Sequence, residues 1–160
     1  EARFCDALAD ARLEGATDAG RAQNVDFDVV TVPGALEVPT AIAMAERLAE
    51  YDGYVALGCV IRGETTHYDT VCNDSSRGLM LLGLEGLAIG NGILTVENEA
   101  QAVVRADPAG QNKGGGAAAA ALHLIALSRK YAATRPQPAL APEDRDPIRL
   151  AGRLEGPNGA

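Results

Sequence analysis

The chain is poor in aromatic residues. Its 160 residues include no tryptophan, two phenylalanines and four tyrosines, so aromatics make up only 4% of the sequence. A ring-shaped ligand can therefore stack on very few side chains. Long apolar runs are also missing, since none approaches the ~20 residues that a membrane-spanning helix needs, and no secretory signal is present. The sequence thus predicts a protein without a membrane span. Because it begins at Glu1 without a methionine, we expect a fragment or a trimmed chain.

Basic residues and cysteines are scarce as well. The 14 lysines and arginines are outnumbered by 22 aspartates and glutamates, which leaves a net charge of -8. Non-specific nucleic-acid binding needs a basic face, so the charge argues against that class, whereas a small anionic ligand needs only one or two local cations. Cys5, Cys59 and Cys72 are odd in number and widely spaced. This spacing argues against a disulfide framework and predicts a reducing, cytoplasmic setting.

Hydrophobic patterning predicts an α/β fold. Runs of β-branched and apolar residues indicate strands at 27–32, 54–61 and 87–95, and helical patterns cover 4–22, 39–50, 66–84, 97–106 and 113–131. Alternating strands and helices are typical of parallel βαβ units with helices on both faces of the sheet. Five of the eight prolines fall after residue 131. We therefore predict one domain at 1–131 and a poorly ordered proline-rich tail at 132–160, with at most a short amphipathic turn near 148–154.

Three segments that follow strands carry chemically active side chains. Because the strand-to-helix turns of a parallel sheet emerge at one edge, we expect these segments to converge there. The first is 33–39, which combines a tight backbone with Glu37. The second is 58–69, where an apolar strand stops at a glycine turn and a helix opens with two threonines and His67. The third runs from Gly90-Asn91-Gly92 to Thr95 and precedes a helix that ends in Arg105. Phe4, at the start of the first helix, is expected at the same edge.

The segment at 58–69 is the most informative. A helix N-terminus carries about half a positive charge and unpaired N–H groups, so it suits a phosphate. A histidine beside a bound phosphate is a candidate for proton transfer, because its pKa lies near neutrality. The pattern predicts a site for a polar heterocycle together with a phosphate.

Each of these residues also has a purely structural interpretation. His67 fits a helix-start residue that bonds a neighbouring carbonyl, and Glu37 fits a cap on the following helix. Arg105 is equally compatible with a solvated cation at a helix end. Lys113, which precedes three glycines, belongs either to an anion-binding nest or to a flexible joint. His123 lies within a helical run of leucine and alanine, where a structural role is favoured.

Two other ligand classes are disfavoured. Cys59, His67 and Cys72 do not have the spacing of zinc ligands. Gly90-Asn91-Gly92 lacks the third glycine of a dinucleotide fingerprint. We therefore predict no metal site, and a nucleotide-binding regulator is a distant alternative.

Taken in order, the motifs resemble those of the lumazine synthase family over about residues 1–131. The matching stretches are Ala2 to Phe4, Val32 to Pro39, Gly58 to Asn73, Gly92 to Asn98, Gln101 with Arg105-Ala106, and Asn112 to Gly114. So many ordered motifs argue against a chance match. The resemblance implies a three-layer α/β/α fold with a short, mainly parallel, flavodoxin-like sheet. The family has a strand ahead of Ala2, so we expect this sequence to contain only the end of a truncated first strand.

The resemblance also implies an activity. The family condenses 5-amino-6-ribitylamino-uracil with 3,4-dihydroxy-2-butanone 4-phosphate to give 6,7-dimethyl-8-ribityllumazine and phosphate, without a metal or organic cofactor. By position, His67 would carry protons and Arg105 would pair with the phosphate. The resemblance therefore favours a functional role over a purely structural one for both residues. The other implied substrate-binding residues are Phe4 for ring stacking, Ala35, Leu36 and Glu37 for the ribityl chain, Cys59, Val60 and Ile61 for the pyrimidine, Glu64 and Thr65 for the phosphate, Asn91 in place of a second aromatic, and Lys113.

Family members share each site between neighbouring subunits of a pentamer, and some build icosahedral shells. The resemblance thus implies a homopentamer in which Arg105 and Asn91 reach the site of the adjacent chain. The link at 107–111 differs from the glycine-rich link of shell formers, which favours a lone pentamer. The alternatives are a non-catalytic relative that binds flavin or lumazine and a shell-forming assembly protein.

Overall fold

The computed structural model of this chain describes residues 1–3 and 6–134, and it contains five helices and two strands in that part. In chain order these are α1 (Asp6–Arg21), α2 (Glu37–Leu48), β1 (Tyr54–Ile61), α3 (His67–Leu84), β2 (Ile89–Val96), α4 (Glu99–Ala106) and α5 (Lys113–Thr134). Each predicted helix is present, with its ends moved by a few residues. The predicted tail at 132–160, with the turn near 148–154, lies outside the described residues from 135 onward.

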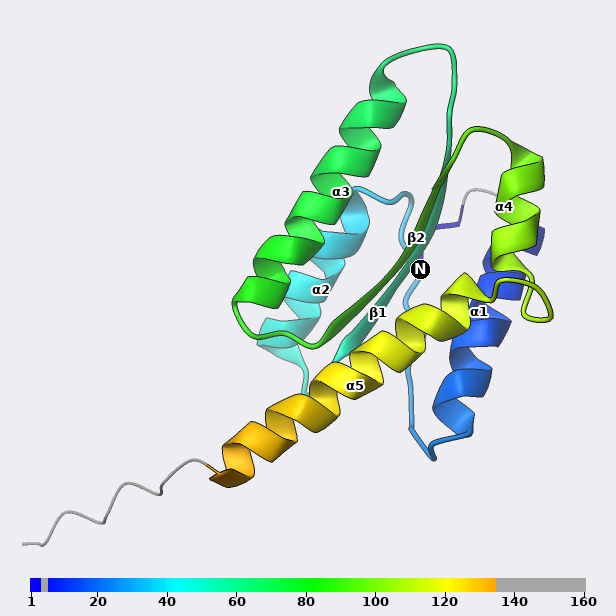
Figure 1. The fold of residues 1–160 in the computed structure, drawn as a ribbon. Coiled ribbons are helices and arrows are strands. Elements are labelled where there is room, and N and C mark those ends of the chain that lie inside the picture. The colour runs from blue at the N-terminus through cyan, green and yellow to red at the C-terminus, as the bar shows by residue number, and fades with distance from the viewer. Residues whose placement is uncertain (4–5, 135–160) are drawn as a thin grey trace, which may run out of the picture.

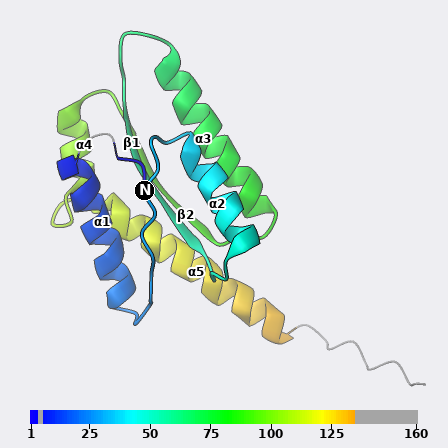
Figure 2. The same ribbon diagram turned by 180° about the vertical axis from the view of Figure 1, so that it is seen from behind.

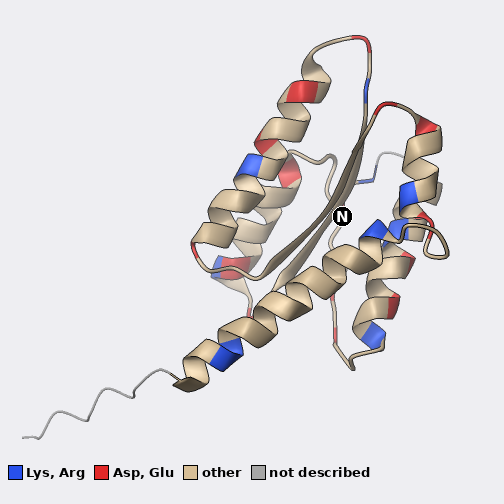
Figure 3. Ribbon diagram, viewed as in Figure 1, with Lys and Arg blue, Asp and Glu red and all other residues tan. Residues whose placement is uncertain are grey.

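The sheet forms the middle of three layers. β1 and β2 pair in parallel, with Tyr54 opposite Ile89 and Ile61 opposite Val96. Helices α2 and α3 cover one face, and α1, α4 and α5 cover the other (Figures 1 and 2). Both strands are free of charged residues, whereas acidic and basic positions are spread over the helices and turns (Figure 3). The expected three-layer α/β/α fold is confirmed.

The hydrophobic core lies on both sides of β1, because successive strand residues point to opposite faces. Ala56 packs with Val38, Ile42 and Leu79 beneath α2 and α3, and its neighbour Leu57 packs toward α1 and α5. A third cluster beneath α1 and α4 consists of Leu8, Cys59, Leu94, Val96, Ala102 and Ala106. Apolar groups on both faces anchor β1, so its carboxyl end is a rigid support for the turn that follows.

The strand predicted at 27–32 is wrong. Within 27–32, only Val32 forms a β-bridge, a single parallel one to Ala2 that lies outside the two-stranded sheet. Its N–H donates to the Glu1 carbonyl at 2.9 Å, and the Ala2 N–H donates to the Leu57 carbonyl at 2.8 Å. Phe27, five residues before Val32, leaves 42% of its surface exposed. A strand requires a hydrogen-bonding neighbour about 4.8 Å away, and a cavity separates most of this segment from β1.

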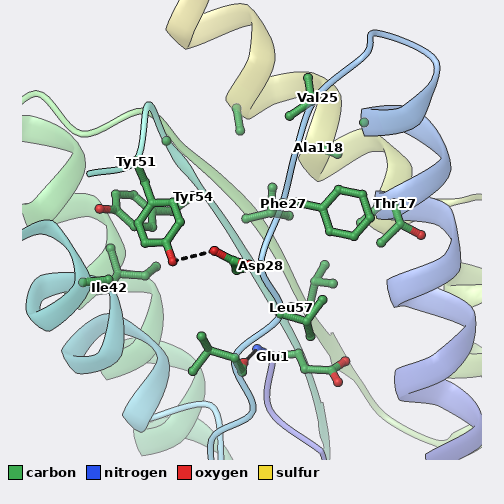
Figure 4. A pocket seen from close by; sticks show the side chains of 18 of the residues that line it. Glu1, Thr17, Val25, Phe27, Asp28, Ile42, Tyr51, Tyr54, Leu57 and Ala118 are labelled. Atoms are coloured by element: carbon green, nitrogen blue, oxygen red, sulfur yellow. Dashed lines mark hydrogen bonds between the residues drawn. The ribbon is translucent and has the colours of Figure 1, made fainter. Parts of the chain in front are cut away.

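That cavity has a volume of about 360 Å³ and is mainly apolar (Figure 4). Phe27 and Val30 line it from the predicted strand, and Tyr54 and Leu57 line it from β1. The Tyr51 hydroxyl donates to the Asp28 carboxylate at 2.9 Å across one end. The segment at 27–31 therefore runs beside the sheet without completing it, although its composition is that of a strand.

Helix α2 begins at Glu37, two residues before Pro39, where the sequence pattern placed its start. A proline is tolerated there because the N–H groups of a first helical turn have no partner within the helix.

None of the helices in the described ranges combines the length and the apolar composition that crossing a membrane would take.

Candidate active site

The carboxyl end of β1 leads directly to the predicted histidine. Cys59 is 8% exposed, Val60 and Ile61 are half-buried, and Glu64 and Thr65 lie exposed in the turn that follows. His67 is the first residue of α3 and is also exposed. The structure therefore brings these predicted residues together at one strand end, in the order that the sequence indicated.

The first turn of α3 has no side-chain cap, although its Asp69 N–H donates to the Thr66 carbonyl at 3.0 Å. Thr66 occupies the capping position, yet its side chain caps no N–H group. The His67 N–H donates to the Thr65 hydroxyl over 3.4 Å, which is long for a hydrogen bond. Since α3 has 18 residues, the positive end of its dipole can attract a phosphate, whose oxygens accept hydrogen bonds from the N–H groups that remain unpaired, such as that of His67.

The turn before α2 belongs to the same layer. Ala35 is buried, and Leu36 and Glu37 are exposed at the helix start. The Glu37 N–H donates to the Gly34 carbonyl at 3.3 Å, which closes a tight turn. Pro39 packs on Gly78 of α3, where an added Cβ would lie 2.8 Å from the proline ring. The two predicted segments, 35–37 and 59–67, therefore lie in and beside the α2/α3 layer.

Arg105 lies in the opposite layer. It occupies the last turn of α4, is half-buried, and donates from Nη1 to the Gln101 carbonyl at 3.1 Å. Lys113, the first residue of α5, is exposed in the same layer. Figures 1 and 2 show α4 and α5 across the sheet from α3. One copy of the chain thus keeps Arg105 and Lys113 apart from His67.

Asn91 is not part of a strand-to-helix turn, which corrects the expectation for the segment at 90–92. This segment lies within β2, where Asn91 pairs with Ala56 and is five residues from the strand end. Its side-chain oxygen accepts the Ile93 N–H at 3.0 Å. The glycines beside it serve packing, since a Cβ on Gly90 would collide with the Ala117 carbonyl of α5. Phe4 lies outside the described residues.

Sequence reasoning missed Arg62, which joins the ends of both strands. Its Nε donates to Glu97 Oε2 at 2.7 Å, and Nη1 donates to Asp69 Oδ1 at 3.4 Å. Its guanidinium carbon lies 4.0 Å from the centre of the Tyr68 ring. The hydrogen bond to Glu97 raises the pKa of Arg62. Opposite charges just after two neighbouring parallel strands were the sequence pattern that could have predicted this pair.

Burial shifts the pKa of two other groups near this turn. It raises the pKa of the Tyr68 hydroxyl, and a hydrogen bond with Cys72 adds to the effect. Burial also raises the pKa of the Cys72 thiol. Cys72 is therefore a neutral packing and hydrogen-bonding group at neutral pH. Within residues 1–3 and 6–134, no three His, Cys, Asp or Glu side chains converge as metal ligands would.

The fold and this edge define a class of protein: a three-layer α/β/α domain with an exposed histidine at a helix N-terminus beside a parallel sheet. The model of the 6,7-dimethyl-8-ribityllumazine synthase family matches residues 1–129. The chain belongs to this family.

Several curated relatives carry that family name. The protein of Novosphingobium aromaticivorans is 57% identical over 131 residues, which are 82% of this chain and 94% of the relative. The protein of Bartonella henselae is 58% identical over 134 residues, 82% of this chain and 86% of the relative. The protein of a Jannaschia species is 52% identical over 150 residues, 94% of this chain and 83% of the relative.

Proposed function

We propose that this chain catalyses the condensation of 5-amino-6-(D-ribitylamino)uracil with 3,4-dihydroxy-2-butanone 4-phosphate. The products are 6,7-dimethyl-8-ribityllumazine, phosphate and water, and the reaction belongs to riboflavin biosynthesis. Membership of the family and the names of the relatives support this proposal. The structural observation that carries it is the exposed His67 at the N-terminus of α3, directly after a buried strand.

The chemistry needs a proton carrier and a phosphate site. An amine of the pyrimidine attacks the ketone and forms an imine with loss of water. The imine rearranges with loss of phosphate, and the second amine closes the ring with loss of another water. Each step moves a proton, which suits the imidazole of His67 as alternate donor and acceptor. The phosphate would lie at Glu64, Thr65 and the start of α3, where amide groups and Arg105 stabilise its charge as it leaves. Positioning of two substrates supplies much of the remaining acceleration.

The other substrate contacts follow from position. The backbone of Cys59 to Ile61 would bind the pyrimidine, and the turn at 35–37 would bind the ribityl chain. Phe4 would stack on the ring, and Asn91 and Lys113 would complete the site from a neighbouring copy. No part of this scheme calls for a metal or an organic cofactor. Cys72 is a free thiol in the structure, which is compatible with the reducing cytoplasm that we propose as the location of this chain.

We propose a homopentamer with its sites between neighbouring chains. The placement of His67 and Arg105 in opposite layers supports a shared site. Large apolar side chains of α3 and α5 are also exposed, including Leu84 at 78% and Tyr131 at 63%. They flank a groove of about 560 Å³. Exposed apolar patches of this kind are typical of interfaces.

Native mass spectrometry tests the assembly. We expect a dominant species of five times the 16.5 kDa chain mass, because burying the exposed faces of α3 and α5 removes apolar surface from water. A Leu84→Glu variant should shift the population toward smaller species, since it places charges in the proposed interface. A wild-type chain that stays monomeric at micromolar concentration would contradict the shared site.

The activity is tested by mixing the purified chain with both substrates and following lumazine absorbance against the uncatalysed rate. We expect a clear acceleration, and we expect His67→Ala to lower kcat by about a hundredfold without abolishing turnover, because proton transfer is only one part of the catalysis. His123→Ala is the control, as that residue lies mid-helix in α5. Tight flavin binding without turnover would favour the non-catalytic alternative. Complete loss of activity in a folded, ligand-binding His67→Ala would contradict the moderate role.

A further inference from the structure

One guanidinium group holds together the segments that surround His67. Arg62 follows the last residue of β1, and its backbone N–H donates to the Val96 carbonyl at the end of β2 at 2.9 Å. Its side chain donates from Nε to Glu97, just after β2, at 2.7 Å. It also donates from Nη1 to Asp69, in the first turn of α3, at 3.4 Å. The same residue therefore joins both strand ends to the helix that begins with His67.

The face of the guanidinium makes a further contact. Its central carbon lies 4.0 Å from the centre of the Tyr68 ring, well within the ~6 Å limit of a cation–π interaction. The Tyr68 hydroxyl interacts in turn with Cys72 and Thr95, which belong to α3 and β2. An arginine suits this place because its planar fork bonds carboxylates in its own plane and stacks on an aromatic ring with its face.

These four residues, Arg62, Tyr68, Asp69 and Glu97, form what we name the Arg62 clamp. Apart from the clamp, the turn before His67 is held mainly through the Thr66 carbonyl, which accepts the Asp69 N–H at 3.0 Å. Gly63 has no atom within 4 Å of where its Cβ would lie, and the turn residues 63–66 are exposed. The His67 N–H makes only the long contact to Thr65. The two residues that follow His67 are both held by Arg62, so the clamp sets the direction in which α3 begins.

We propose that Arg62 is a positioning residue that holds His67 and the N-terminus of α3 in place through the clamp. The proposal rests on the proposed function, because it assigns His67 the proton transfer. Each contact is partly exposed, with 40% of the Arg62 side chain and 56% of the Glu97 side chain accessible, so each alone is weak. Because all these contacts are made by one planar group, together they hold the start of α3 in a single position.

The experiment compares Arg62→Met, which keeps most of the stem but removes the charge and the donors, with Arg62→Lys. The control is Arg47→Met, which removes an exposed arginine that bonds only a carbonyl of its own helix, α2. We expect kcat of Arg62→Met to fall about tenfold with KM for either substrate nearly unchanged, because misplacing a reacting group affects the transition state more than binding. Arg62→Lys should recover only part of the loss. Glu97→Gln should add little to Arg62→Met, because the two share one contact.

Hydrogen exchange gives a readout that does not depend on turnover. Amides at 63–69 should exchange faster in Arg62→Met than in the wild type, while the amides of β1 exchange at the same rate in both. In Arg47→Met, the amides at 63–69 should exchange as they do in the wild type. Unchanged exchange at 63–69, a change confined to KM, or full recovery by lysine would each overturn the proposal. If the wild type itself fails to accelerate the reaction, the proposed function fails, and exchange at 63–69 still decides whether the clamp orders the turn.

Discussion

Replacing Arg105 with methionine is expected to lower kcat by about a thousandfold. The leaving phosphate develops charge as it departs, and loss of one oriented donor to such a charge costs about 10²–10³ in rate. The hydrogen bond to Gln101 and partial burial already hold the Arg105 side chain along α4. Arg105→Lys keeps the charge without the planar fork, so we expect it to retain intermediate activity. Steady-state kinetics with saturating substrates measures both.

A folding defect would also lower the measured kcat, so the melting temperature of Arg105→Met must stay close to that of the wild type. The buried residues of α4 are Ala102 and Ala106, which this substitution leaves untouched. An active Arg105→Met with kcat within threefold of the wild type would contradict a role for this residue at the phosphate.

The same variant tests whether the site is shared. Arg105→Met and His67→Ala are each expected to be impaired, but assemblies that contain both chains should recover activity. If neighbouring chains supply these residues, about a quarter of the interfaces in an equal mixture carry an intact pair, by random pairing within a closed ring. Co-expression followed by the lumazine assay measures the recovery. No recovery in assemblies that contain both chains would show that each chain builds its site alone.

Gly114→Ala is expected to destabilise the chain by about 3 kcal/mol, at the upper end for a small-to-large change in a packed contact. Helix α5 passes so close to α1 that a Cβ on Gly114 would collide with the Arg12 carbonyl, a backbone atom that cannot move aside. Gly15 on α1 is equally close to Asn112, just before α5. Urea unfolding at a fixed chain concentration measures the change, because an oligomer's stability depends on concentration.

Gly116→Ala is the matched control in the same helix turn. No atom lies within 4 Å of where its Cβ would be. An alanine there should stabilise the chain by about 0.5–1 kcal/mol through lower conformational entropy of the unfolded state. Equal effects of the two substitutions would show that close approach of α1 and α5 does not explain Gly114.

The local sequence pattern was sufficient to predict β1 and the start of α3. An apolar run, a glycine turn and a threonine-rich helix start lie next to one another in the sequence, and adjacent residues stay adjacent in space. The same reasoning failed at 27–32, where β-branched residues indicated a strand. Whether such a segment becomes a strand depends on a neighbour at hydrogen-bonding distance, and a cavity lies there instead. The strand predicted at 87–95 is present as β2, but the placement of 90–92 in a strand-to-helix turn was wrong, because the close approach of α5 to β2 accounts for the glycines.

Contiguous stretches of sequence were enough to predict the fold class, the family, and the position of His67 after a buried strand. All three depend on periodicity and on motifs of contiguous residues, which short-range sterics and burial translate directly into structure. Three features became known only from the packed domain: Arg62 bonds Glu97 and Asp69, Gly114 lets α1 and α5 pack closely, and His67 and Arg105 lie in opposite layers. These facts depend on which segments meet across the sheet, and contacts between distant residues are set by the packing of the whole domain.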